Sequence, residues 1–139
     1  FGNQQIVSVA MGQLGNSGGQ KFWSWYGFES RVEWCACFAS WCAEQSGMVA
    51  SGQVLKFSSC AVGASWFQGQ GRWKGKGYTP SAGDFIFFDW NKDGQVDHVG
   101  IVVNVANGRV NTIEGNTSNM VARRSYQLGG IVIVGYGYI

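Results

Sequence analysis

Cys35 and His98 are the two residues of this chain whose side chains could together break an amide bond. A thiol attacks a carbonyl as the thiolate, and a helix N-terminus or a neighbouring imidazole lowers its pKa. Cys35 lies in the first turn of a helix that we expect to begin near Glu33 or Trp34, where backbone N–H groups converge and can also bind an oxyanion. His98 is the only histidine among the 139 residues. A cysteine mechanism therefore has one candidate general base.

The structural alternative is that these side chains only pack, because buried cysteines are common and a lone histidine is more often structural than catalytic. Cys37 lies on a different face of the same helix and Cys42 lies two turns further along, so we expect both to be core side chains. The four cysteines are too few for a disulfide scaffold, and they do not repeat as paired CxxC motifs.

The order of residues around a predicted hairpin brings Glu114 toward His98. The Asn-Gly pair at 107–108 is a strong signal for a two-residue turn between strands. Residues whose numbers sum to about 215 then face each other, which pairs Glu114 with Ile101. A carboxylate there could hold the second nitrogen of the imidazole, as the third member of a catalytic triad does. Asn116 is the other candidate for this role, and a solvent-facing Glu114 is the alternative.

An acidic loop leads into the strand that carries His98. Its pattern, D-x-N-x-D-G-x-x-D, places oxygen side chains at alternate positions, a glycine for a sharp turn and a backbone carbonyl at the seventh position, as a Ca²⁺ loop requires. The twelfth position is Gly100 where an EF-hand has a bidentate Glu, so any Ca²⁺ site would be completed differently. A metal-free Asn/Asp/Gly turn is the alternative. The candidate ligands are Asp89, Asn91, Asp93, Gln95 and Asp97.

The elements that must position these residues change character near Pro80. Before it, apolar spacing predicts helices, the second of which is apolar nearly all round and therefore buried. After it, β-rich runs separated by Gly and Asn predict strands. This order predicts an α+β fold with N-terminal helices packed on one side of a small antiparallel sheet. The predicted helices are residues 4–14, 34–45 and 60–68, and the predicted strands are residues 84–88, 98–105, 109–115, 120–126 and 131–139.

The composition fits one globular domain spanning residues 1–139. It is 45% hydrophobic and only 13% charged, with a net charge of +2, which allows a real core and leaves no footprint for nucleic acid. The longest apolar runs have strand length, so we expect no membrane span. Because the chain starts at Phe1 without an initiator Met or a leader, we expect a domain excised from a longer protein, and monomeric by default.

Four segments together resemble the CHAP domain, the cysteine, histidine-dependent amidohydrolase/peptidase family of the papain-like NlpC/P60 group. They are EWCACFASWC, PSAGDFIFFDW, DHVGIVV and TIEGNT, and the resemblance runs from the first helix to the final strand. The family's nucleophile falls on Cys35, its general base on His98, its orienting acidic residue on Glu114 and the following Asn on Asn116. The resemblance also implies that the cysteine, at a helix N-terminus, faces the histidine strand.

The resemblance implies a peptidoglycan hydrolase, acting as an N-acetylmuramoyl-L-alanine amidase or as an endopeptidase. It implies action outside the cell at the bacterial wall, in a secreted or phage-borne protein. No cofactor is required for the chemistry, although some members bind Ca²⁺ near the active site. The chain departs from the family at Cys37, a second thiol that could react with an oxidised nucleophile.

Three alternatives remain on the residues alone. A non-catalytic wall-binding module would use exposed aromatic rings, a structural Zn²⁺ site would use three cysteines with His98, and a related enzyme would cut a small amide outside the wall. In the preferred interpretation, the aromatic side chains that line a substrate groove are Tyr26, Trp34 and Trp90.

Overall fold

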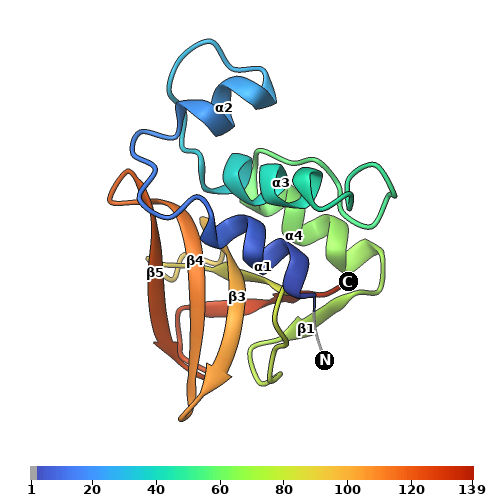
Figure 1. Cartoon of the computed structure of the whole chain (residues 1–139). Helices are drawn as coiled ribbons and strands as arrows, with labels where there is room; N and C mark the ends of the chain where they lie inside the picture. The colour runs from blue at the N-terminus through green and yellow to red at the C-terminus, as the bar shows by residue number, and fades with distance from the viewer. Residues whose placement is uncertain (1–2) are drawn as a thin grey trace.

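The computed structural model describes residues 3–139 and confirms an α+β fold (Figure 1). The helices are α1 (Gln4–Met11), α2 (Gln20–Tyr26), α3 (Cys35–Gln45) and α4 (Cys60–Gly69). The strands are β1 (Trp73–Gly75), β2 (Phe85–Phe88), β3 (His98–Ala106), β4 (Arg109–Thr117), β5 (Met120–Gln127) and β6 (Ile133–Gly137). They form one sheet in the order β1-β6-β2-β3-β4-β5, with antiparallel pairing between neighbours.

The helices pack on one side of the sheet, as expected, and α2 lies further out against α3 (Figure 1). Helix α3 is buried on every side from Cys35 to Ala43, which confirms that it is a central helix. It contacts both β3 and β4. Close approach to β4 depends on Gly115, because a Cβ atom there would lie 2.5 Å from the Cβ of Phe38.

Local side-chain caps explain where two of the helices begin. The Asn3 side chain accepts hydrogen bonds from the backbone N–H groups of Gln5 and Ile6, and the Ser59 hydroxyl accepts one from Val62. Such caps satisfy N–H groups that have no partner inside the helix. Helix α4 is thereby fixed to start at Cys60.

Two elements were not predicted. The aromatic cluster at residues 22–26 forms part of helix α2, and strand β1 lies in the glycine-rich segment between the third predicted helix and Pro80. β1 is three residues long and pairs with β6, more than fifty positions later, so only the tertiary fold makes it a strand. Helix α1 ends at Met11, earlier than expected, and β6 covers 133–137 of the predicted 131–139.

The β3–β4 hairpin turns at residues 107–108 as predicted, but its register shifts at Val103. Near the turn the paired residues sum to 215, whereas beyond the shift Ile101 pairs with Ile113. The predicted pairing of Glu114 with Ile101 is therefore wrong. Ile101 and Ile113 both face the helices in the main core, so the predicted register would have pointed the Glu114 carboxylate into that core. An extra residue in one strand reverses which face the following side chains occupy.

The opposite face of the sheet carries a smaller apolar cluster that includes Phe88, Val102 and Tyr136. His98 pairs with Phe88 and therefore lies on this face. No helix among residues 3–139 has the length and apolar character to cross a bilayer.

Candidate active site

Cys35 is the first residue of α3 and is almost completely buried, with 5% of its surface exposed. The preceding residue, Trp34, anchors this end of the helix because its ring stacks on Phe22 with centroids 5.7 Å apart. Its indole Nε1 donates to Asn119 Oδ1 at 3.2 Å. Trp34 is 0% exposed, so the prediction that it lines a groove is wrong. It holds the helix start in place from the core side.

His98 lies at the first position of β3 and is connected to Glu114 on β4. The distance from His98 Nε2 to Glu114 Oε1 is 2.9 Å, and both residues are buried. The imidazole ring also lies beside the rings of Phe88 and Trp90, with centroids 5.8 and 5.5 Å away. Because Glu114 occupies Nε2, the other ring nitrogen is left for a partner on the opposite side of the ring.

Glu114 is held by two further hydrogen bonds that the sequence did not reveal. Its Oε2 accepts from the Thr112 hydroxyl and from the Tyr126 hydroxyl, each at 2.6 Å. Burial and the neighbouring Glu114 carboxylate raise the pKa of Tyr126, so the phenol stays protonated as a donor. With His98 on Oε1, both oxygens of this buried carboxylate have partners. Thr112 could have been found from the sequence, because it lies two residues before Glu114 on the same strand and so on the same face. Tyr126 lies on another strand, β5, and no sequence feature connects it with Glu114.

Gly100 provides the space that Glu114 occupies. The two residues lie at opposing positions beyond the register shift, and a Cβ atom on Gly100 would lie 2.6 Å from Glu114 Cγ. This Cγ is in the middle of a buried, fully bonded side chain, so it has no room to move away.

Gly100→Ala is therefore expected to destabilise the fold by about 1–3 kcal/mol, the usual cost of overpacking a filled interior. It should also displace Glu114 from His98 and lower any activity that needs that pair. Gly75→Ala is the matched control, because a Cβ atom on this strand glycine meets nothing within 4 Å. Chemical denaturation of the two variants measures the difference, and equal stabilities would contradict the packing argument.

The electrostatics of the Cys35–His98 pair favour a thiolate and an imidazolium. Hydrogen bonds from Cys60, from His98 and from the Val99 backbone, together with the His98 charge, lower the pKa of Cys35 well below its ordinary value against the opposing effect of burial. Burial alone would lower the pKa of His98, but its interactions with Cys35 and Glu114 outweigh this and raise it to about 10. The ionised pair therefore exists from the lowered pKa of the thiol up to about pH 10.

The other cysteines are not activated in this way. Burial raises the pKa of Cys37 to about 11 and raises that of Cys42 well above its ordinary value. All four cysteines are free. The neighbour of the Cys35 sulfur is Cys60, with the two Sγ atoms 3.4 Å apart, and not Cys37 as the sequence suggested. At neutral pH, Cys35 is thus the one cysteine placed to react.

The hydrogen bonds of the Asn116 side chain go to residues other than His98. This side chain accepts from Arg31 at 2.8 Å and donates to Glu33 at 2.8 Å, and the Asn116 backbone is left-handed with φ of 57°. Alternation along β4 fails here because the β4–β5 register shifts between Glu114 and Thr117. Of the two residues predicted to orient the His98 ring, Glu114 is therefore the one that hydrogen-bonds to it. Asn116 is a lining residue of the cavity.

These residues surround an open cavity of about 510 Å³. Trp90 forms part of its wall and is 43% exposed, as expected for a groove residue. Tyr26 does not line this cavity. It is the last residue of α2, and its ring stacks on Phe28 and lies below the Lys56 ammonium group. The lining residues are Glu33, Cys35, Trp90, Asp97, His98, Glu114, Asn116, Thr117, Ser118, Arg124 and Tyr126.

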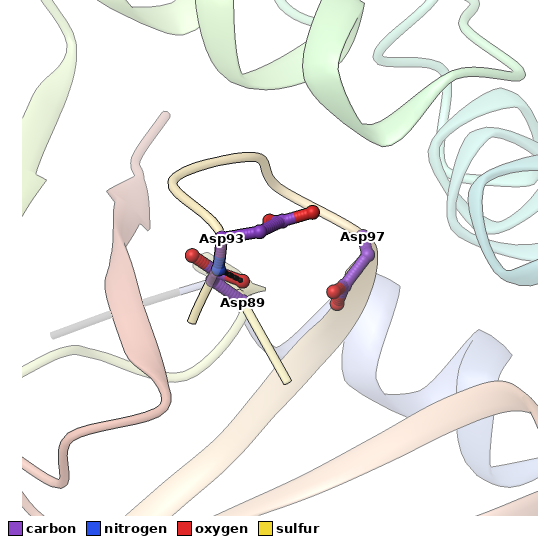
Figure 2. Close-up of side chains that lie close together, drawn as sticks. All are labelled: Asp89, Asp93 and Asp97. Carbon is purple, nitrogen blue, oxygen red and sulfur yellow. Dashed lines mark hydrogen bonds between the residues drawn. The ribbon is translucent and has the colours of Figure 1, made fainter. Parts of the chain in front are cut away.

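The acidic loop between β2 and β3 gathers three carboxylates, from Asp89, Asp93 and Asp97, whose oxygen atoms lie within 4.8 Å of one another (Figure 2). The other two predicted ligands come from the same loop: the Asn91 side chain accepts from the Asp93 backbone at 3.3 Å, and Gln95 lies between Asp93 and Asp97 in the sequence. The carboxylates also accept backbone N–H groups, among them Gly94 on Asp89 at 2.8 Å. Each oxygen has two lone pairs, so these bonds do not exhaust the donor set.

This acidic group is the only cluster of three or more His, Cys, Asp or Glu side chains in residues 3–139 that could hold a metal ion. The cysteines do not converge with His98 on a common centre. The alternative of a structural Zn²⁺ site is therefore contradicted by the structure.

Comparison with known proteins agrees with the fold. A model of the CHAP domain family matches residues 13–116. The crystal structure of Ly7917 has a TM-score of 0.62 and 17% identity, and the match covers 99% of this chain and 62% of that one. The crystal structure of Ly7917 with the hydrolyzing product of MDP has a TM-score of 0.62 and 19% identity, covering 97% and 62%. No curated protein matches. This chain spans less than two thirds of the length of those solved structures.

Proposed function

This chain belongs to the CHAP domain family, and from that premise we propose that it hydrolyses amide bonds of bacterial peptidoglycan with Cys35 as nucleophile. One observation carries the proposal: His98 interacts with Cys35 on one side and with Glu114 on the other, and all three residues line the same cavity. A buried imidazole held by a buried carboxylate beside a thiol is the arrangement that thiol acyl transfer needs.

The reaction begins with the Cys35 thiolate adding to the scissile carbonyl carbon. The carbonyl oxygen becomes an oxyanion, which backbone N–H groups in the first turn of α3 stabilise. The imidazolium of His98 gives its proton to the amide nitrogen as the C–N bond breaks, which releases the amine and leaves a thioester. Neutral His98 then takes one proton from water, whose oxygen attacks the thioester carbon; the C–S bond breaks, a carboxylic acid is released, and the Cys35 thiolate beside the His98 imidazolium is restored. Glu114 keeps the ring oriented throughout.

The residues that line the cavity are suited to binding a fragment of the cell wall. Trp90 offers an exposed ring for a sugar or a peptide side chain, and Arg124 offers a cation for a carboxylate. A solved structure with a similar fold was obtained with the hydrolyzing product of MDP. We propose that the natural substrate is intact peptidoglycan outside the cell, reached as part of a longer secreted or phage-borne protein.

The test is the release of soluble fragments from purified sacculi of several bacteria, followed by mass spectrometry of the products. New free amino groups on stem or cross-bridge residues identify an endopeptidase, whereas stem peptides that begin with L-Ala and glycans that lack them identify an amidase. Failure to release fragments from any type of sacculus, with Cys35 reduced and the protein folded, would refute the proposed function.

We also propose that the acidic loop binds Ca²⁺ through Asp89, Asp93 and Asp97. Hard carboxylate oxygens are the ligands that Ca²⁺ prefers, and three negative charges this close together favour a cation. The ion, when bound, supplies structural charge and no step of the reaction. Its effect on the chemistry would be to hold the loop that leads into His98.

Removal of Ca²⁺ is expected to lower the melting temperature, because a ligand at about 100 times its dissociation constant adds about 2.7 kcal/mol of stability. The Asp93→Asn variant should lose this dependence on Ca²⁺. Glu29→Gln, which makes the same charge change at an exposed residue outside the loop, should keep it. Differential scanning calorimetry with Ca²⁺ and with EDTA measures both, and identical curves for the unaltered protein would exclude the site.

A further inference from the structure

The sulfur of Cys60 lies 3.4 Å from the sulfur of Cys35, which is hydrogen-bond distance for a thiol donor. Cys60 is 9% exposed and starts helix α4, whose first turn is capped by the Ser59 hydroxyl on Val62. The two sulfur atoms therefore come from the N-termini of two different helices. They are 25 positions apart in the sequence, which explains why the sequence alone gave no sign of the contact.

The direction of the hydrogen bond follows from the surroundings of each sulfur. His98 and the Val99 backbone N–H both face Cys35 and favour its negative form. For Cys60 the effects run the other way: the hydrogen-bonded Cys35 thiolate, burial and the nearby charge of Asp97 all raise its pKa. Cys60 thus keeps its proton while Cys35 gives its proton up, and the Cys60 S–H group donates.

We propose that Cys60 is a positioning residue for the nucleophile, whose S–H group donates a hydrogen bond to the Cys35 thiolate and stabilises it between catalytic cycles. The proposal rests on the proposed function in taking Cys35 as the nucleophile. Cys60 does not touch the substrate in this role; it acts through the sulfur of Cys35.

The hydrogen bond stabilises the resting thiolate more than the tetrahedral adduct. As Cys35 forms its bond to the carbonyl carbon, negative charge passes from the sulfur to the carbonyl oxygen, and the Cys60 donor loses its acceptor. A thiolate with a lower pKa is present at lower pH, but it is also a weaker nucleophile. The contact therefore has opposite effects on the amount of thiolate and on its reactivity.

This opposition predicts a crossing of two pH profiles. In Cys60→Ala, loss of one hydrogen bond to a charged acceptor should raise the pKa of Cys35 by roughly one unit. At acidic pH the thiolate is then about tenfold scarcer but also more reactive, so the reaction should be about three- to fourfold slower. At high pH, where every Cys35 is ionised, the variant should react up to about threefold faster, given a Brønsted coefficient of roughly 0.4–0.5. A purely structural loss would slow the reaction at every pH.

The experiment measures the alkylation rate of Cys35 by iodoacetamide between about pH 4 and pH 10, with pre-reduced protein and peptide mass spectrometry as the readout. Cys60→Val repeats the loss of the donor with a side chain that fills the space, should Cys60→Ala fail to fold. Cys60→Ser, which keeps a hydroxyl donor, should give a profile between those of the unaltered protein and Cys60→Ala. Cys42→Ala is the matched control, because it removes a fully buried thiol from α3 that is not a neighbour of the Cys35 sulfur.

A Cys35 profile that is the same in Cys60→Ala or Cys60→Val as in the unaltered protein overturns the proposal. An equal shift in Cys42→Ala overturns it as well, because the effect would then come from general loss of packing. Alkylation requires no wall substrate. A shifted profile in a protein that releases no fragments from sacculi would thus support the role of Cys60 while refuting the proposed function.

Discussion

Cys35→Ala is expected to lose the release of wall fragments by roughly three orders of magnitude or more, because no other group can form the thioester. The variant should fold normally, since alanine is compatible with the first position of α3 and the change removes only one sulfur atom from the edge of the core. Thermal unfolding and binding to sacculi are the measurements that separate lost chemistry from lost structure.

Cys42→Ala is the control for this prediction. Cys42 is a fully buried thiol on the same helix, and burial raises its pKa well above the ordinary value, so its loss should cost stability but no chemistry. Iodoacetamide should inactivate the unaltered protein with the label on Cys35. Hydrolysis by folded Cys35→Ala at a rate within tenfold of the unaltered protein would remove the basis for the cysteine mechanism.

The proposed nucleophile and the proposed base could be picked out from the sequence because both depend on local features. Cys35 follows from the start of an apolar helix, and His98 from its being the only histidine at the entry of a strand. Glu114 followed from the hairpin turn, but a regular hairpin would have placed it on the helix side of the sheet. The extra residue at Val103 brings it to the face of His98, and no residue type at this position signals such a bulge.

The rest of the site depends on contacts between distant elements. Cys60 reaches Cys35 because α4 packs beside α3, and Tyr126 reaches Glu114 from the strand after the next turn. The members of each pair lie on different elements, so neither helical nor strand periodicity in the sequence indicates that they are in contact. The errors at Trp34 and Asn116 have the same origin: an aromatic ring next to the nucleophile can face the core, and alternation along a strand ends where its register shifts.

Glu114→Gln is expected to reduce the rate by about two to three orders of magnitude, because the carboxylate both orients the imidazole and stabilises its charged form. The amide has nearly the same shape, so the hydrogen bonds with the Thr112 and Tyr126 hydroxyls can be kept by rotation of those hydroxyls. The pKa of His98, raised to about 10 in the unaltered protein, should fall when the negative charge is removed. Since activity requires the imidazolium as proton donor, the alkaline limb of the pH–rate profile should then move to lower pH.

The control is Glu33→Gln, which removes a carboxylate from the same cavity at a side chain that is 81% exposed and pairs with Arg31. It changes the net charge equally, but an exposed pair is screened by solvent and does not touch His98. Its pH–rate profile should keep the alkaline limb of the unaltered protein. If both variants shift that limb equally, the effect arises from net charge in the cavity. The contact at 2.9 Å between His98 and Glu114 would then have no special part in the reaction.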